Sequence, residues 1–225
     1  MTMRSGVDIW TETGGEGGPT LVLIHGLGAN GAVWNGLKPL IERHWPGRWL
    51  NLDLRGHGRS GHGGPYGYGL FAADVATAIG GQDERVAIVG HSMGGVVAMA
   101  LATGWYGVTV ERVLAFGVKI AWAEGEAEKM RKVATAPVRW FDTREEAVER
   151  YLKVSGLIGL VDPGSPEAAA GIRETDGRFA LAADPGINAA VGPTVASIYG
   201  AARAPVRLAA GEADPMVSKA DMTPL

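Results

Sequence analysis

Residues 90–95 read Gly-His-Ser-Met-Gly-Gly and follow directly on the apolar run Val-Ala-Ile-Val at 86–89. The pattern Gly-x-Ser-x-Gly between a strand and a helix is typical of a sharp turn, the nucleophile elbow, which lifts the serine hydroxyl clear of the chain. Side chains two residues before and after the serine would collide in such a turn, so glycine is expected at both places. A serine hydroxyl attacks only when a base removes its proton. Ser92 is therefore a candidate nucleophile that still needs a base.

Size, composition and charge limit the classes of protein to consider. A chain of 225 residues suits one domain with room for an inserted subdomain. It has no cysteine, which excludes disulfides, thiol nucleophiles and cysteine-based metal sites and is compatible with the cytoplasmic location that we predict. With 21 basic and 24 acidic residues the net charge is −3, which gives no reason to expect nucleic-acid binding.

Targeting and membrane signals are missing as well. The first residues contain no apolar core of a signal peptide, and no apolar run approaches the roughly 20 residues that cross a bilayer. The expected partner is a small-molecule substrate, with no nucleic acid and no membrane. The oligomeric state stays open.

Apolar runs and helical patterns alternate along the first half of the chain. Strands are expected at 20–24, 48–53, 85–89 and 110–117, and helices at 32–44, 70–79 and 93–103. Strands that alternate with helices of roughly ten to fifteen residues indicate a parallel sheet covered on both faces. The strand pattern returns at 205–210.

The alternation stops near Ile120, and we interpret residues 121–195 as a helical lid inserted into a core made of residues 1–120 and 196–225. Thr143 with Glu146 forms a capping box at the start of one helix, and Gly156 follows its end. The apolar side chains of the insertion either line an acyl pocket above Ser92 or form a small core of their own. They include Trp122, Trp140 and Leu157.

Four motifs and the insertion follow one another in a fixed order along the chain. These are His-Gly-Leu-Gly at 25–28, Asp-Leu-Arg-Gly-His-Gly-Arg-Ser at 53–60, the turn at Ser92, the insertion, and Gly-Glu-Ala-Asp-Pro at 211–215. In this order the chain resembles the α/β-hydrolase superfamily, in its serine-nucleophile branch, over nearly its whole length. The resemblance implies the α/β-hydrolase fold, with a mostly parallel sheet, helices on both faces and a helical lid, but with the final strand and helix missing. It implies no cofactor and no metal.

The resemblance also implies roles for particular residues. Ser92 would be the nucleophile, and the backbone N–H groups of Leu27 and Met93 would form the oxyanion hole. The positive N-terminal end of the helix at 93–103 favours that oxyanion. Asp214 would be the acid that orients a histidine. A serine at the elbow argues against haloalkane dehalogenases and epoxide hydrolases of this fold, which carry an aspartate there.

The histidine that this family places after its acid is missing, because residues 215–225 contain none. His25 and His57 belong to motifs that the family uses structurally. His91 adjoins the serine, but the elbow directs neighbouring side chains away from the hydroxyl, which makes it a poor base. His44, near a predicted helix end, and His62, in a glycine-rich loop, are interpreted as surface residues.

Two explanations of the missing base stay open. The first, which we favour, is that the sequence is a C-terminally shortened hydrolase; typical lengths of the missing helices, strand and loop add up to roughly 35–45 residues. The second is that the protein natively lacks its base. In both cases we expect the 225-residue chain to hydrolyse esters slowly, because loss of a triad member leaves only ~10³–10⁴-fold acceleration over water.

The predicted function is cofactor-independent hydrolysis of small esters or related acyl compounds through an acyl-enzyme on Ser92. A C–C bond hydrolase or a cofactor-free haloperoxidase of the same fold would carry the same motifs. The alternative from another class is a non-catalytic ligand-binding protein on this scaffold. The missing base favours that alternative, whereas the intact elbow and Asp214 oppose it.

Asp53 and Asp74 are expected to be structural, and Asp184 and Asp221 are weak competitors for the role of the acid.

Overall fold

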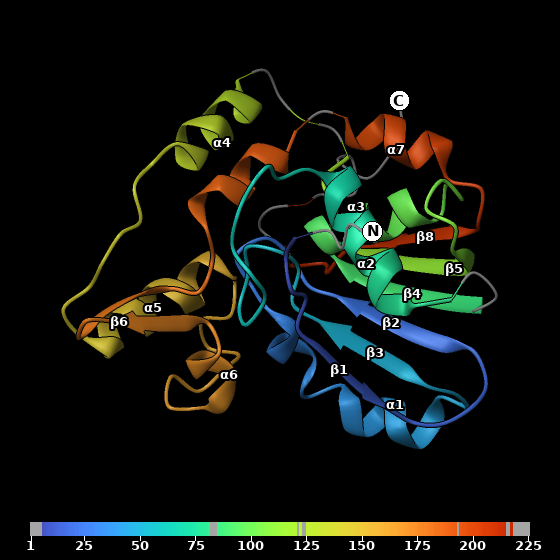
Figure 1. Ribbon diagram of the computed structural model, residues 1–225, viewed down its shortest axis with the longest axis horizontal. Helices are drawn as coiled ribbons and strands as arrows, with labels where there is room; N and C mark the ends of the chain where they lie inside the picture. The colour runs from blue at the N-terminus through green and yellow to red at the C-terminus, as the bar shows by residue number, and fades with distance from the viewer. Residues whose placement is uncertain are drawn as a thin grey trace.

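The core is a six-stranded sheet, seen in a computed structural model that describes residues 6–81, 85–120, 122, 125–192, 194–214 and 217 (Figure 1). Its strand order is β1–β3–β2–β4–β5–β8. In this order the strands are β1 (Thr11–Gly14), β3 (Trp49–Leu52), β2 (Thr20–Ile24), β4 (Arg85–His91), β5 (Thr109–Phe116) and β8 (Val206–Ala209). Only β1 runs antiparallel to its neighbour in this sheet. The predicted parallel sheet is therefore confirmed, with an unpredicted antiparallel edge strand.

Helices cover both faces of the sheet. One face carries α2 (Tyr68–Ile79), α3 (Met93–Leu101) and α7 (Val195–Ala201), and the other carries η1 (Gly31–Trp34) and α1 (Lys38–His44). Along β2, Val22 packs into the core beneath α2 and α3, whereas Leu23 packs with Trp34 and Ile41 on the opposite face. Because β2 is buried on both faces, its sequence is a continuous apolar run.

The expected helix at 32–44 is divided. The 3₁₀ helix η1 ends at Trp34, and α1 begins at Lys38. Asn35 and Gly36 occupy the break, and both have low helix propensity.

The insertion forms a separate layer beside the carboxyl ends of the strands, to the left of the sheet in Figure 1. It contains α4 (Glu126–Ala134), α5 (Arg144–Val154), α6 (Pro166–Ala169), β6 (Ile172–Thr175), β7 (Arg178–Leu181) and η2 (Pro185–Ala190). The expectation of a wholly helical lid is wrong, because β6 and β7 pair as an antiparallel hairpin. Asp176 and Gly177 close it, both at positive φ (51° and 71°), as a two-residue primed turn requires.

Helix α5 starts and stops as the sequence predicted. The Thr143 hydroxyl accepts a hydrogen bond from the Glu146 N–H at 3.3 Å, and Gly156 takes a positive φ of 73° just beyond the C-cap. The buried Tyr151 on this helix accepts a hydrogen bond from the Asn30 side chain at 3.1 Å. That bond joins the insertion to the loop that follows β2.

Further contacts join the insertion to the loop that follows β3. The Asp184 N–H donates to the Gly56 carbonyl at 2.8 Å, and the Gly58 N–H donates to the Ala182 carbonyl at 2.5 Å. The insertion thus rests on the loops at the carboxyl edge of the sheet. Asp221, one of the weak competitors for the role of the acid, lies outside the described residues. Over the described residues, no helix combines the length and the apolarity needed to cross a membrane.

Candidate active site

The turn between β4 and α3 has the geometry of a nucleophile elbow. Ser92 occupies it with φ 50° and ψ −118°, a conformation that non-glycine residues rarely adopt. A Cβ on Gly90 would lie 2.5 Å from the Gly94 carbonyl oxygen. A Cβ on Gly94 would overlap the carbonyl oxygens of Ile24 and His25 at the end of β2. The predicted steric reason for glycine at both positions is confirmed.

The turn after β2 lies directly beside the elbow. The position that a Cβ on Gly26 would take is 3.2 Å from the Ser92 Cβ, and Gly28 closes the turn with a φ of 74°. Neither the Leu27 N–H nor the Met93 N–H donates a hydrogen bond within the described part of the chain. Free backbone donors on two sides of a serine are what an oxyanion hole requires.

His25 and His57 are held by backbone groups. His25 Nδ1 lies 2.8 Å from the Gly26 carbonyl oxygen, and its Nε2 accepts from the Leu54 N–H at 2.9 Å. Burial lowers the pKa of His25. His57 Nδ1 lies 3.0 Å from the Arg55 carbonyl oxygen, and burial lowers its pKa to about 3. Both rings are neutral supports of the loops, which agrees with the structural role that the resemblance implied.

Asp53 and Asp74 also hold the loop that follows β3. Asp53 accepts hydrogen bonds from the Gly31 N–H at 2.7 Å and from the Arg59 N–H and Nε at 2.8 Å. Burial acts to raise the pKa of Asp53, but the Arg59 bonds and other favourable contacts outweigh it, so the pKa is lowered overall. Asp74 forms a buried ion pair with Arg55. Both carboxylates are structural, as expected.

Asp214 follows β8 and lies near His91, a proximity that the sequence reasoning missed. Both side chains lie next to Gly117. A Cβ placed on Gly117 would be 3.2 Å from the His91 Nε2 and 3.6 Å from the Asp214 Oδ2. The other side of the imidazole faces Gly26, with Nδ1 2.9 Å from the corresponding Cβ position. Burial lowers the pKa of His91, and the Asp214 charge opposes that shift. The order β4–β5–β8 explains the proximity, because Gly117 ends the strand between them.

Asp184 is engaged elsewhere. Its Oδ2 accepts a hydrogen bond from the Tyr66 hydroxyl at 2.7 Å, and its Oδ1 caps η2. This carboxylate anchors the insertion, which removes it as a competitor for the role of the acid.

The three residues expected to line an acyl pocket, Trp122, Trp140 and Leu157, contact different parts of the chain. Trp122 donates from Nε1 to the Lys119 carbonyl at 3.1 Å, and Leu157 packs into the small core of the insertion. Trp140 lies against two arginines of the hairpin. For Leu157 the contacts correspond to the second sequence interpretation, a core residue of the insertion.

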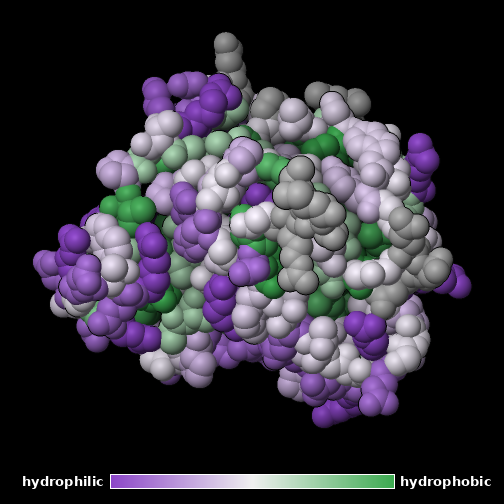
Figure 2. All heavy atoms as spheres, viewed as in Figure 1, coloured by the Kyte–Doolittle hydropathy of each residue, from purple (hydrophilic) through white to green (hydrophobic). Residues whose placement is uncertain are grey.

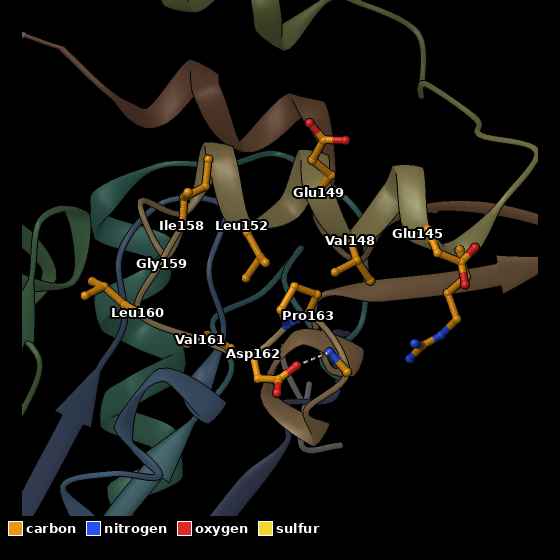
Figure 3. Close-up of a pocket in the computed structure, with 12 residues that line it drawn as sticks. Glu145, Val148, Glu149, Leu152, Ile158, Gly159, Leu160, Val161, Asp162 and Pro163 are labelled. Carbon is orange, nitrogen blue, oxygen red and sulfur yellow. Dashed lines mark hydrogen bonds between the residues drawn. The ribbon is translucent and has the colours of Figure 1, made fainter.

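A hollow of about 850 Å³ lies in the insertion, between α5 and residues 158–164 (Figure 3). Neither Ser92 nor Asp214 lines it, and none of the three expected pocket residues does. Val148 and Leu152 point into it from α5, with Glu145 and Glu149 beside them. This hollow is separate from the Ser92 turn. Within the described residues, no cluster of three or more His, Asp or Glu side chains could hold a metal ion.

Comparison with known proteins agrees with this geometry. The family model described as "Alpha/beta hydrolase family" matches residues 21–224. A "Serine hydrolase-like protein" of Danio rerio is 31% identical over 201 residues, which are 80% of this chain and 60% of that protein. A "Pimeloyl-[acyl-carrier protein] methyl ester esterase" of Klebsiella pneumoniae is 41% identical over 98 residues, 42% of this chain and 35% of that protein. The chain thus spans 60% or less of these two relatives.

Among solved structures, the "Thioesterase Domain From Curacin Biosynthetic Pathway" superimposes with a TM-score of 0.72. The match covers 98% of this chain and 84% of that one at 20% identity, so it speaks for the fold alone. The sheet order, the elbow at Ser92 and the match of the family model over 21–224 lead to one conclusion: the chain belongs to the alpha/beta hydrolase family.

Proposed function

We propose that this protein is a serine hydrolase of small esters and that Ser92 forms the acyl-enzyme. The observation that carries the proposal is the backbone of Ser92, held at φ 50° between β4 and α3 with the Gly26–Gly28 turn at its side. A strained residue at the carboxyl edge of a sheet persists only where the surrounding structure enforces it, and such residues cluster at active sites.

The reaction would proceed in two steps. The Ser92 Oγ attacks the ester carbonyl carbon, and the developing oxyanion is met by the N–H groups of Leu27 and Met93. The alcohol leaves with a proton, and water then attacks the acyl-enzyme to release the acid. The Ser92 proton must pass to a base. In a triad this base is an imidazole, and Asp214 is the carboxylate that would orient and stabilise it. Among the described residues, no imidazole forms a hydrogen bond with Ser92. No histidine follows Asp214 in these 225 residues, so turnover of this chain is expected to be slow.

Both named relatives support the class of substrate. One is called serine hydrolase-like, and the other is named as an esterase of a methyl ester. Hydrolysis of a methyl ester, the reaction in the second name, cleaves an acyl–oxygen bond, for which an activated serine and an oxyanion hole suffice without a cofactor.

A fluorophosphonate probe tests the proposal, because it phosphonylates a serine whose hydroxyl is activated. Intact-mass and peptide analysis should find one adduct, on Ser92, and the Ser92→Ala variant should carry none. Ser155, a matched control, donates its hydroxyl to the Tyr151 carbonyl and should stay unmodified. Because the reaction is expected to be slow, the incubation is extended over hours; no adduct on a folded chain even then would favour the non-catalytic ligand-binding protein.

A further inference from the structure

Two arginines of the β6–β7 hairpin share the ring of Trp140. The antiparallel bridge between Phe141 and Phe179 continues the hairpin register, in which Arg173 pairs with Ala180. Trp140 therefore falls in one cross-strand row with Ala180 and Arg173, and the small alanine lies between the two large side chains. The Arg173 guanidinium carbon lies 5.3 Å from the centroid of the Trp140 ring, and that of Arg178 lies 5.1 Å from it.

These guanidinium groups lack the counter-charge that other arginines have. Arg55 pairs with Asp74, and Arg131 pairs with Glu128. Within the described part of the chain, by contrast, no carboxylate lies within ion-pair distance of Arg173 or Arg178. The Arg173 Nε is buried and has no hydrogen-bond partner. A buried donor of a charged group that has no partner is costly.

The nearby acidic groups form no ion pair with either arginine. One of them is Asp142, which falls opposite Arg178 in the same register but lies beyond ion-pair distance of it. Glu174 is on the opposite face of β6 by strand alternation, and Asp176 lies in the hairpin turn. Asp184 is already hydrogen-bonded to the Tyr66 hydroxyl. The pKa of His62 is lowered first by burial and then by the charge of Arg173, while the charge of Asp184 acts in the opposite direction.

We propose that Trp140, Arg173 and Arg178 form a binding site for an oxyanion, a carboxylate or a phosphate group, carried by a ligand of this protein. A guanidinium whose face lies over an aromatic ring keeps its N–H edge available, and that edge matches two oxygens of a carboxylate or a phosphate. The Arg173 Nε is covered, so the anion would bind the outer Nη groups of the two guanidinium groups. This site needs no chemistry at Ser92 and goes beyond the proposed esterase function.

The site is open to solvent. Arg178 is exposed, and Trp140 and Arg173 are half-buried. Figure 2 shows hydrophilic side chains gathered on the left of the molecule, where Figure 1 places β6 and α5. An anion can reach this surface without any movement of the core.

Chemical footprinting tests the site without reference to hydrolysis. Phenylglyoxal modifies free guanidinium groups, and peptide mass spectrometry reports the rate at each arginine. Inorganic phosphate in one arm and succinate in the other should slow modification of Arg173 and Arg178 several-fold, and the more protective arm identifies the oxyanion. Chloride at equal ionic strength should not protect. Arg150, exposed on α5, serves as the internal control and should react at an unchanged rate.

Variants give the second measurement. Arg173→Gln and Arg178→Gln should each weaken the apparent affinity for the protecting anion by about tenfold, the usual size for one charge-assisted hydrogen bond. Arg150→Gln should leave the affinity unchanged. Arg178→Gln removes an exposed side chain and is expected to fold, with circular dichroism as the check.

Equal reactivity of Arg173 and Arg178 with and without phosphate and succinate would overturn the proposal. Equal protection by chloride would also overturn it, since that result means charge screening alone. Fluorophosphonate labelling of Ser92 should be unchanged in both variants. If Ser92 is not labelled while phosphate or succinate still protects the arginines, the esterase proposal fails and the anion site stands.

Discussion

At Ser92 the positive φ is imposed by close approach of the neighbouring backbone. Gly94 lies against the carbonyl oxygens of Ile24 and His25, which belong to the end of β2. Backbone atoms cannot rotate away as a side chain can, so the elbow and the turn beside it act as one rigid unit. This contact couples the position of the candidate nucleophile to that of the candidate oxyanion donors.

Replacing Gly94 by alanine should therefore lower the free energy of unfolding by about 3 kcal/mol, the upper end of the usual range for overpacking. The measurement is urea denaturation followed by circular dichroism. Gly36→Ala is the matched control, because nothing lies within 4 Å of its Cβ position, and it should change stability by less than about 0.5 kcal/mol. Equal stability of the two variants would contradict the steric account of the elbow.

The buried, neutral His57 predicts a loss of stability in acid. Its folded pKa of about 3 lies below the ordinary 6.5, so the unfolded chain takes up the proton first as the pH falls. The stability contribution is complete above pH 6.5 and declines toward pH 3, by about 3 kcal/mol between pH 7 and pH 4. In His57→Asn, whose amide can still donate to the Arg55 carbonyl, the fall in unfolding free energy over this range should be smaller by that amount. An identical pH dependence in both proteins would show that His57 is not the group responsible.

At the scale of elements, some strands could be predicted from the sequence and others could not. The strands β2 and β3 are buried on both faces, so their largely apolar runs stand out in the sequence. The edge strand β1 reads Thr-Glu-Thr-Gly and has no such run. The β6–β7 hairpin has mixed polar and apolar residues, and its best signal in the sequence is the Asp176-Gly177 pair at its turn. Single-sequence patterns therefore find the buried elements and miss the exposed ones.

Helix α5 allows a test of its predicted cap. Thr143→Ala removes the hydroxyl that accepts from the Glu146 N–H and should cost about 1 kcal/mol. Hydrogen exchange of the amides in the first turn of α5 should accelerate about fivefold, which is the corresponding change in an opening constant. Thr143→Ser keeps the acceptor oxygen and should exchange at nearly the wild-type rate. Acceleration of the same size in Thr143→Ser would mean that the hydroxyl is not the cause.

At the scale of the whole molecule, hydrogen bonds connect the insertion to the loops that follow β2 and β3. The bond between Asn30 and Tyr151 is buried, and Asn30 also caps η1 through its Oδ1. Tyr151→Phe leaves the Asn30 amide without this partner and should lower the unfolding free energy by about 1–3 kcal/mol. Tyr199→Phe is the control, because the Tyr199 hydroxyl makes no hydrogen bond within the described chain. Equal denaturation midpoints for the two variants would argue against this contact as an anchor.

The candidate site was predictable in part. Ser92, the glycines at 90 and 94, and the turn at Leu27 follow from local motifs whose steric demands are visible in the sequence. The position of His91 relative to Asp214 is not local, because it depends on the order of three strands in the sheet. Nor could the sequence show that Leu157 packs within the insertion or that Arg173 and Arg178 share Trp140, since both depend on the unpredicted hairpin.

The central claim is that Ser92 carries the acyl group. The most direct measurement is to mix the protein with an activated ester such as p-nitrophenyl acetate, quench in acid over a time course, and locate the added acetyl group by peptide mass spectrometry. We expect an acetyl group on the peptide that contains Ser92, formed slowly and absent from Ser92→Ala. An acetyl group on another residue, or the same modification in Ser92→Ala, would contradict it.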